Sequence, residues 1–155
     1  MAYRVAIVDD NNIDAEYVHS ILNAWALDRQ ACVQVQQFTS AENFLFQYAE
    51  DKDWDILLLD IEMGAIDGVS LAKKIRQENE TVQIVFITGF ADYISEGYEV
   101  SALHYLMKPV KQEELFAVFH EGAVIRRGTH AELVADETGK YHELWHGQAQ
   151  YYTEK

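Results

Sequence analysis

Five short apolar segments recur along the chain, and each is followed by a segment whose apolar residues are spaced as on one face of a helix. The segment 55–60 is almost continuously apolar, which is typical of a strand buried on both faces of a parallel sheet. This alternation predicts a flavodoxin-like, doubly wound α/β fold: a (βα)5 parallel five-stranded sheet with helices on both faces. Strands are expected at 5–8, 32–38, 55–60, 82–87 and 102–107, and helices at 13–25, 44–49, 69–75, 91–98 and 111–119.

Polar and glycine residues suggest where these elements begin and end. Asn11-Asn12 and Ser40 precede helical segments and are suitable N-caps. Asp67-Gly68 marks a turn before the next helical segment, and Gly97 is expected to interrupt the helix 91–98.

The composition limits the class of partner. The 155 residues are enough for one domain with a sizeable core, and 49% of them are hydrophobic. Lys and Arg total 12 against 26 Asp and Glu, for a net charge of −14, which argues against direct nucleic-acid binding and against an anionic membrane surface.

The single cysteine, Cys32, excludes an internal disulfide, and its apolar neighbours predict a small core residue. With no signal-like start and no run long enough to span a bilayer, a cytoplasmic protein is expected.

Polar residues gather where the expected strands end. Asp9-Asp10 follow the first strand, Asp60 ends the third, Thr88 follows the fourth and Lys108 the fifth. In an open parallel sheet these carboxyl ends meet at one edge, which is where ligands bind. Converging carboxylates repel one another unless a hard cation such as Mg²⁺ binds them, and a lysine and a hydroxyl beside them suit an additional anion. Together they predict a phosphoryl-transfer site with a carboxylate nucleophile.

Each of these residues taken singly has a simpler explanation. Asp9-Asp10 could cap a helix, Thr88 could bond to backbone, and Lys108 could be a surface lysine. The prediction therefore depends on finding all of them at successive strand ends.

Several segments closely resemble the motif set of two-component receiver domains over about residues 3–119. These are Ile-Val-Asp-Asp, Leu-Leu-Leu-Asp-Ile-Glu-Met, Asp-Gly, Ile-Val-Phe-Ile-Thr-Gly and Tyr-Leu-Met-Lys-Pro. The phrases Asp-Ile-Glu-Met and Glu-Gly-Tyr-Glu-Val-Ser-Ala-Leu-His-Tyr-Leu-Met-Lys-Pro look most like receivers of LytTR-class transcriptional regulators.

The resemblance implies a phosphoacceptor signalling domain, with self-phosphorylation and autodephosphorylation as its only reactions, rather than a turnover enzyme. Asp60 would accept the phosphoryl group of a histidine kinase's phosphohistidine. Asp10, Asp60 and the backbone carbonyl of Glu62 would ligate Mg²⁺, and Asp9 would act mainly through a metal-bound water.

The resemblance also assigns the switching residues. Lys108 would pair with a phosphoryl oxygen, Thr88 would move toward the phosphoryl group, and Tyr105 would turn inward with it. The Lys108–Pro109 peptide would be cis. The resulting state would reach a partner, or a second copy in a homodimer, through the face made by 91–98, 102–107 and 111–119 or through a C-terminal helix. Many relatives have proline where this chain has Gly64, a change that would loosen the loop after Asp60.

Three other functions remain in view. A haloacid-dehalogenase-type phosphatase would need an aspartate where this chain has Glu62, and metal-binding acids after the lysine. A flavin binder would need a Ser/Thr/Gly-rich loop after the first strand, where this chain is acidic. A phosphorylation-independent interaction module remains an alternative, although such receivers usually lose acids or the lysine.

The C-terminal segment differs from the rest. Residues 120–155 resemble the end of an ABC-transporter nucleotide-binding domain, yet no phosphate-binding glycine-lysine loop occurs in the sequence. We therefore expect a receiver domain over 1–121 and a mainly helical extension over 122–155, and the two unrelated resemblances in one short chain suggest a fusion. The helix 111–119 either ends near Gly122 or continues past it, at a cost of about 1 kcal/mol per glycine.

Overall fold

The protein is described by a computed structural model, in which residues 2–125 form five strands and five helices in strict alternation. All strand pairs are parallel, in the order β2-β1-β3-β4-β5, and this confirms the predicted doubly wound fold. The strands are β1 (Ala2–Val8), β2 (Cys32–Phe38), β3 (Ile56–Leu59), β4 (Gln83–Thr88) and β5 (His104–Met107). The helices are α1 (Asn12–Arg29), α2 (Ala41–Glu50), α3 (Gly68–Glu78), α4 (Ile94–Glu99) and α5 (Gln112–Ile125).

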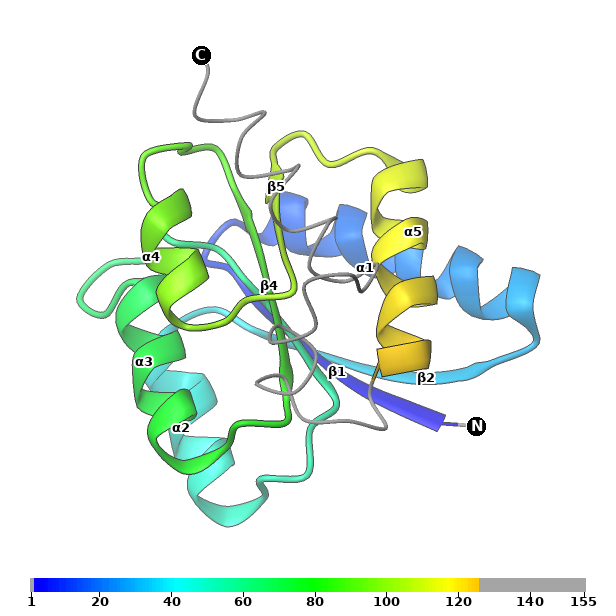
Figure 1. Ribbon diagram of the computed structural model, residues 1–155. Coiled ribbons are helices and arrows are strands. Elements are labelled where there is room, and N and C mark those ends of the chain that lie inside the picture. The colour runs from blue at the N-terminus through cyan, green and yellow to red at the C-terminus, as the bar shows by residue number, and fades with distance from the viewer. Residues whose placement is uncertain (1, 126–155) are drawn as a thin grey trace, which may run out of the picture.

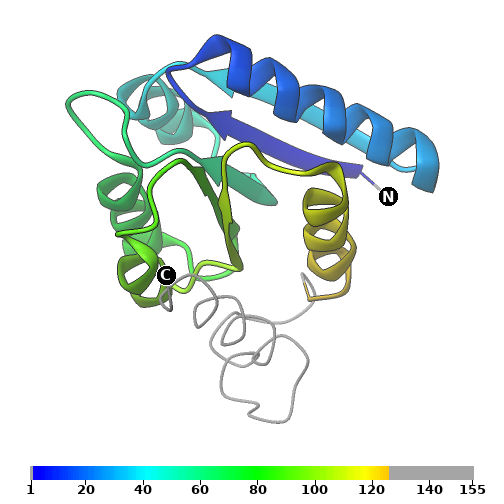
Figure 2. The same cartoon turned by 90° about the horizontal axis from the view of Figure 1, so that it is seen from above.

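The helices cover both faces of the sheet. Helices α1 and α5 lie on one face, and α2, α3 and α4 lie on the other (Figure 1). Figure 2 shows α5 (yellow to gold) across the strands from the green helices α3 and α4. Each face has its own apolar core, one built around Phe44, Leu71 and Phe86, the other around Leu22, Trp25 and Phe119.

Burial of the strands follows their position in the sheet. Every residue of β3 and β4 is buried, as expected of central strands covered on both faces. The edge strand β2 instead alternates between exposed and half-buried positions along most of its length. Cys32 occupies an exposed position of β2, so the prediction that it is a core residue was wrong. Its apolar neighbours Ala31 and Val33 pack against the core, whereas Cys32 faces away from it.

Side-chain caps begin three of the helices. The Asn11 side chain accepts from the Asp14 backbone N–H at 3.1 Å, and Ser40 accepts from Asn43 at 3.1 Å, as predicted for N-caps. Asp67 caps α3 in the same way, with a 2.7 Å bond from the Ser70 N–H. The Asp67-Gly68 pair is therefore the start of a helix.

Helix α4 is shorter than predicted and contains Gly97 without a break. Gly97 is buried, and a Cβ there would lie 3.3 Å from the Tyr105 ring and 3.4 Å from Phe86. The glycine therefore allows α4 to approach β4 and β5 closely, which the predicted interruption did not anticipate.

Helix α5 continues past Gly122 to Ile125, which decides between the two endings that the sequence left open. Residues 126–155 lie outside the described residues, and with them most of the predicted extension and its transporter-like segment. Within residues 2–125, no helix combines the length and apolar character that crossing a bilayer requires.

The start of α3 generates a prediction about stability. A Cβ on Gly68 would lie 2.1 Å from the backbone oxygen of Asp60, a contact that only backbone movement can relieve. Gly68→Ala is expected to lower the free energy of unfolding by about 2 to 3 kcal/mol, despite the better helix propensity of alanine. Chemical denaturation measures this.

The matched control is Gly89→Ala, because a Cβ at Gly89 meets no atom within 4 Å. This variant should stay within about 0.5 kcal/mol of the parent. Equal stabilities of the two variants would show that the close approach at Gly68 carries no cost.

Candidate functional site at the carboxyl edge of the sheet

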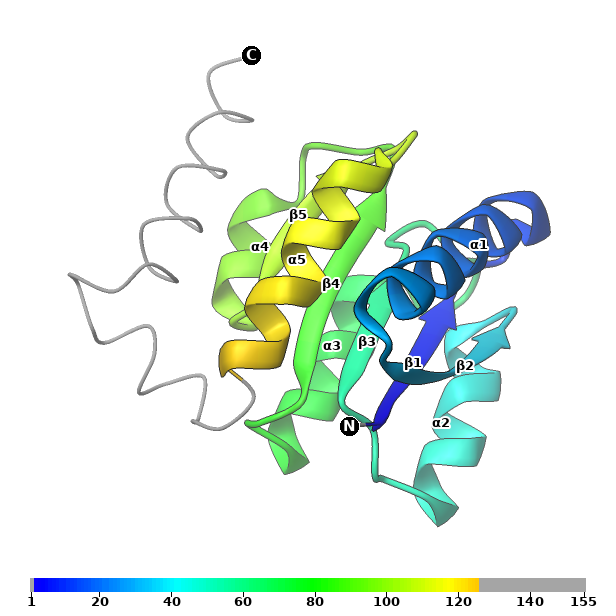
Figure 3. The ribbon, with the colours of Figure 1, turned by 90° about the vertical axis from the view of Figure 1, so that its right-hand side faces the viewer.

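Backbone hydrogen bonds hold the predicted site residues in place just beyond the strand ends. The Asp9 N–H donates to the Phe38 carbonyl and the Asp60 N–H to the Val8 carbonyl, both at 3.0 Å, so parallel pairing continues one residue past β1 and β3. Strands β1 and β4 run upward in Figure 3, and the site lies at their upper ends. The position of these acids is therefore set by the sheet itself.

Three carboxylates meet at this edge. Ligand oxygens of Asp9, Asp10 and Asp60 all lie within 4.8 Å of one another. Asp9 and Asp60 are buried, whereas Asp10 is exposed. An all-oxygen donor set of this charge fits a hard divalent cation such as Mg²⁺.

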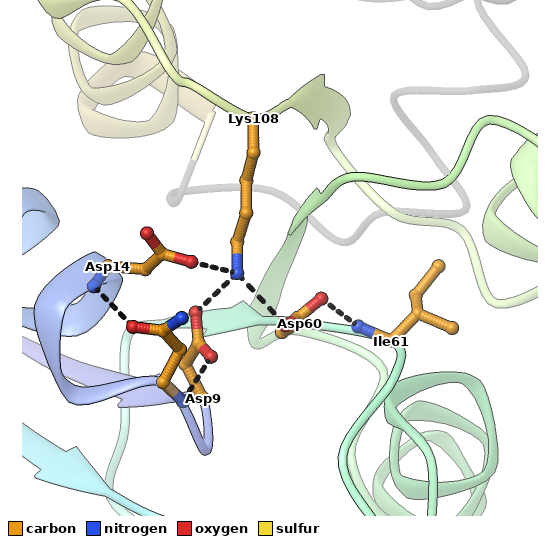
Figure 4. Close-up of polar contacts among 6 residues, drawn as sticks. Asp9, Asp14, Asp60, Ile61 and Lys108 are labelled. Carbon is orange, nitrogen blue, oxygen red and sulfur yellow. Dashed lines mark hydrogen bonds and ion pairs between the residues drawn. The ribbon is translucent and has the colours of Figure 1, made fainter.

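Lys108, directly after the edge strand β5, supplies a positive charge that partly balances these carboxylates. Its N–H donates to the Thr88 carbonyl at 2.8 Å, and its peptide bond to Pro109 is cis. Its ammonium Nζ lies 2.9 Å from Asp9 Oδ2, 2.7 Å from Asp14 Oδ2 and 3.0 Å from Asp60 Oδ2 (Figure 4). The ammonium thus joins β5 to β1, α1 and β3.

Asp14 was not among the residues predicted for the site. It follows the N-cap Asn11 by three residues in the first turn of α1, so its side chain lies at the end of the helix that faces the strand ends. The segment Asp-Asp-Asn-Asn-Ile-Asp could have predicted that Asp14 lies at the site, because an N-cap at Asn11 places Asp14 within one helical turn of Asp10.

The charges of the site perturb one another. Burial lowers the pKa of Lys108, but hydrogen bonds to Asp14, Asp9 and Asp60 outweigh burial and raise it above its ordinary value, so the ammonium stays protonated. Burial also raises the pKa of the Asp9 carboxyl, as does the nearby Asp60 charge, against hydrogen bonds from Asn11 and Lys108. Both partners of one ion pair therefore have raised pKa values, because a single ammonium is shared by three carboxylates and cannot fully compensate a buried one.

Asp60 is also bonded within its own loop. Its Oδ1 accepts from the Ile61 N–H at 2.7 Å. Glu62, whose carbonyl is a predicted metal ligand, follows in this loop with an exposed side chain. Gly64 has φ +82°, a left-handed conformation that glycine adopts readily and proline cannot. Proline could therefore not take the place of Gly64 in this loop conformation.

Thr88 and Tyr105 lie on the other side of Asp60. Thr88 is fully buried, and its hydroxyl has no hydrogen-bond partner among residues 2–125. Tyr105 is buried, packs on the Phe86 ring at 5.9 Å between centroids and donates its hydroxyl proton to the Phe90 carbonyl. Burial raises the pKa of Tyr105. The ring thus already points inward in this structure.

Comparison with known proteins agrees with this geometry. A family model described as the response regulator receiver domain matches residues 5–120. The chain is similar to the transcriptional regulatory protein NatR of Bacillus subtilis (29% identity over 116 residues, 75% of this chain and 48% of that protein). It is also similar to the sensory transduction protein LytT of the same organism (30% over 112 residues, 72% and 44%). A solved CheY-like receiver domain from Methanospirillum hungatei JF-1 superposes with a TM-score of 0.72 at 22% identity, covering 82% of this chain and 98% of that one.

The chain spans about half the length of the curated relatives it matches. The family match ends at residue 120, so the transporter-like resemblance of residues 120–155 gains no support from it.

The raised pKa of Asp9 generates a prediction about pH. The folded protein binds the Asp9 proton more tightly than the unfolded chain does, so the contribution of Asp9 to stability is favourable at low pH and is lost as the pH rises through the raised pKa. Asp9→Asn keeps an acceptor for the Asn11 N–H and removes the charge. Without divalent cations it should raise the free energy of unfolding at pH 7 by about 1 kcal/mol, and the gain should shrink toward pH 4.

The control is Asp53→Asn, the same change at an exposed position outside the site. It should leave stability within about 0.5 kcal/mol of the parent at both pH values. Added Mg²⁺ should stabilise the parent more than Asp9→Asn, because only binding to the folded state raises stability. A destabilised Asp9→Asn at pH 7 would contradict this electrostatic account.

Proposed function

The chain belongs to the response regulator receiver domain family, and from this premise we propose that Asp60 is the residue that accepts the phosphoryl group. The family places the chain in two-component signalling. The phosphoryl donor in such a system is the phosphohistidine of a histidine kinase, which is the partner proposed here.

The position of Asp60 in the sheet carries this assignment. Strand β3 lies between β1 and β4, so Asp60 stands between the acids Asp9 and Asp10 on one side and Thr88 on the other. Lys108, from the edge strand β5, reaches over to the Asp60 carboxylate. A phosphoryl group on Asp60 would therefore have cation-binding acids on one side and a hydroxyl donor on the other, an arrangement that Asp9 and Asp10 lack.

The proposed reaction is a direct transfer. A carboxylate oxygen of Asp60 forms a bond to phosphorus as the phosphorus–nitrogen bond of the phosphohistidine breaks, and the leaving imidazole takes up a proton from solvent. Asp10, Asp60 and the Glu62 carbonyl would hold Mg²⁺, with Asp9 acting mainly through a metal-bound water. Bound Mg²⁺ would neutralise charge on the phosphoryl oxygens. Lys108 supplies a further positive charge to the same oxygens.

The Thr88 hydroxyl, which has no hydrogen-bond partner in the described part of the chain, supports a proposal for the response. A phosphoryl oxygen on Asp60 would give this buried hydroxyl an acceptor, which favours movement of Thr88 toward it. Tyr105, already inward against Phe86, would be held there by that movement, and the α4–β5–α5 face would change with it. This face, or a C-terminal helix, would then bind a partner or a second copy of the chain.

The cellular response to phosphorylation depends on the whole protein, and we propose only its general kind. NatR is a transcriptional regulator by name, so control of transcription is the proposed outcome, by a domain beyond residues 1–121 rather than by nucleic-acid binding of this segment. We also propose that the chain divides into a receiver at 1–121 and an extension at 122–155. A cytoplasmic location is proposed as well. An interaction module that works without phosphorylation is the competing function.

Incubation with Mg²⁺ and acetyl phosphate tests the assignment of Asp60. Intact-mass spectrometry should show one added phosphoryl group on the parent, none after chelation of Mg²⁺ and none on Asp60→Asn. Asp67→Asn is the matched control, because asparagine preserves the α3 N-cap in the same loop. An unmodified parent would favour the interaction module, and a modified Asp60→Asn would refute the assignment.

Replacement of Thr88 by valine tests the proposed response. Thr88→Val removes a hydroxyl that makes no hydrogen bond to any described residue, so unfolding stability should be unchanged or higher by up to about 1 kcal/mol. Phosphorylation of the parent is expected to change its size-exclusion elution, because the altered face binds a second copy of the chain. The variant should still take a phosphoryl group on Asp60, yet fail to show this change in elution. Equal elution changes in both proteins would exclude Thr88 from the relay.

A further inference from the structure

The Lys108 ammonium has no donor to spare in this structure. An ammonium carries three N–H donors, and the three carboxylates of Asp9, Asp14 and Asp60 lie within hydrogen-bond distance of it. A phosphoryl oxygen that is to bond to Lys108 must therefore replace one of these carboxylates.

Asp14 belongs to a closed ring of hydrogen bonds. Asp9 Oδ1 accepts from the Asn11 N–H at 2.9 Å, and Asn11 Oδ1 accepts from the Asp14 N–H at 3.1 Å. The ring closes where Lys108 donates to both Asp14 and Asp9 (Figure 4). The first turn of α1 thus holds the lysine through a contact of 2.7 Å, the shortest of its three.

Asp14 is also the carboxylate most easily released. Its side chain is 39% exposed, against 7% for Asp9 and 8% for Asp60, so it can turn to water without a large desolvation change. It lies outside the set of acids that could share a metal ion, which is Asp9, Asp10 and Asp60. Asp60 itself would carry the phosphoryl group.

We propose that Asp14 is a resting-state anchor of Lys108, which holds the ammonium before phosphorylation and gives up its place to a phosphoryl oxygen. This inference rests on the proposed function of Asp60 and adds a regulatory residue to it. Asp14 acts through Lys108 and is a positioning residue. Its carboxylate competes with the incoming anion for the same donor and repels it, so Asp14 opposes phosphorylation in the resting protein.

The sign of this effect depends on what holds Lys108 when Asp14 is removed. Asp9 and Asp60 still accept from the ammonium, and the Lys108 N–H remains bonded to the Thr88 carbonyl. The Tyr17 hydroxyl also donates to the Val110 carbonyl at 3.0 Å, which ties α1 to the segment after Lys108 independently of Asp14. Lys108 should therefore remain in place, and loss of the competing charge should dominate.

The test is the affinity for beryllofluoride, a phosphoryl analogue, measured at saturating Mg²⁺ by fluorine NMR. Asp14→Asn should bind it about threefold to tenfold more tightly than the parent, because one nearby negative charge is gone and the neutral amide oxygen is a weaker competitor for the Lys108 ammonium. Asp14→Glu, which restores a carboxylate within reach of Lys108, should return the affinity to within about twofold of the parent.

Glu16→Gln is the matched control, because Glu16 is an exposed acid on the same helix that has no partner among the described residues. It loses the same charge and should change the affinity by less than about twofold. A merely structural role for Asp14 would weaken binding and lower the unfolding midpoint together, whereas the proposal requires tighter binding.

The outcomes separate the two proposals. If the parent and all variants fail to bind beryllofluoride, the assignment of Asp60 fails. If the parent binds but Asp14→Asn binds equally or more weakly, the anchor role is wrong and the Asp60 assignment stands. Equal tightening by Asp14→Asn and Glu16→Gln would also overturn the anchor role, because net charge alone would then explain the effect.

Discussion

The contact between one ammonium and three carboxylates at the carboxyl edge of the sheet is the interaction on which the site depends. Lys108, which follows the edge strand β5, draws together side chains from the end of β1, the first turn of α1 and the end of β3. Four acids nevertheless share this edge with one lysine, since Asp10 lies beside Asp9 and Asp60. The site therefore keeps an excess of negative charge, which suits it to a divalent cation and leaves it electrostatically strained without one.

The buried, apolar sheet holds these mutually repelling carboxylates at one edge. The central strands β3 and β4 are buried along their whole length, and two separate cores fix helices to both faces. Because the backbone pairing continues into Asp9 and Asp60, repulsion between their carboxylates cannot move the two backbones apart without breaking the sheet. The packing of α3 also fixes the backbone of Asp60. Gly68 allows α3 to approach this backbone closely, since any larger residue would collide there. A rigid framework thus holds charges in an arrangement that they would not adopt alone.

The sequence allowed the sheet and most of the site to be predicted, because strand ends follow directly from apolar periodicity and parallel strands have a common carboxyl edge. Asp9, Asp10, Asp60, Thr88 and Lys108 come to one edge as expected. Asp14 was missed because its role depends on the helical register that Asn11 sets, not on a strand end. Cys32 and Gly97 were misread because apolar neighbours do not reveal which strand is at an edge, and a glycine in a helix can serve close packing as well as a break.

The most direct measurement is to locate the phosphoryl group chemically. Borohydride reduces an aspartyl phosphate to homoserine, and trypsin releases residues 53–73, which contain Asp53, Asp55, Asp60 and Asp67, as one peptide. After phosphorylation with Mg²⁺ and acetyl phosphate, fragment masses should place the homoserine at position 60. Homoserine at any other aspartate, or its complete absence from a protein that has gained a phosphoryl group, would contradict the account.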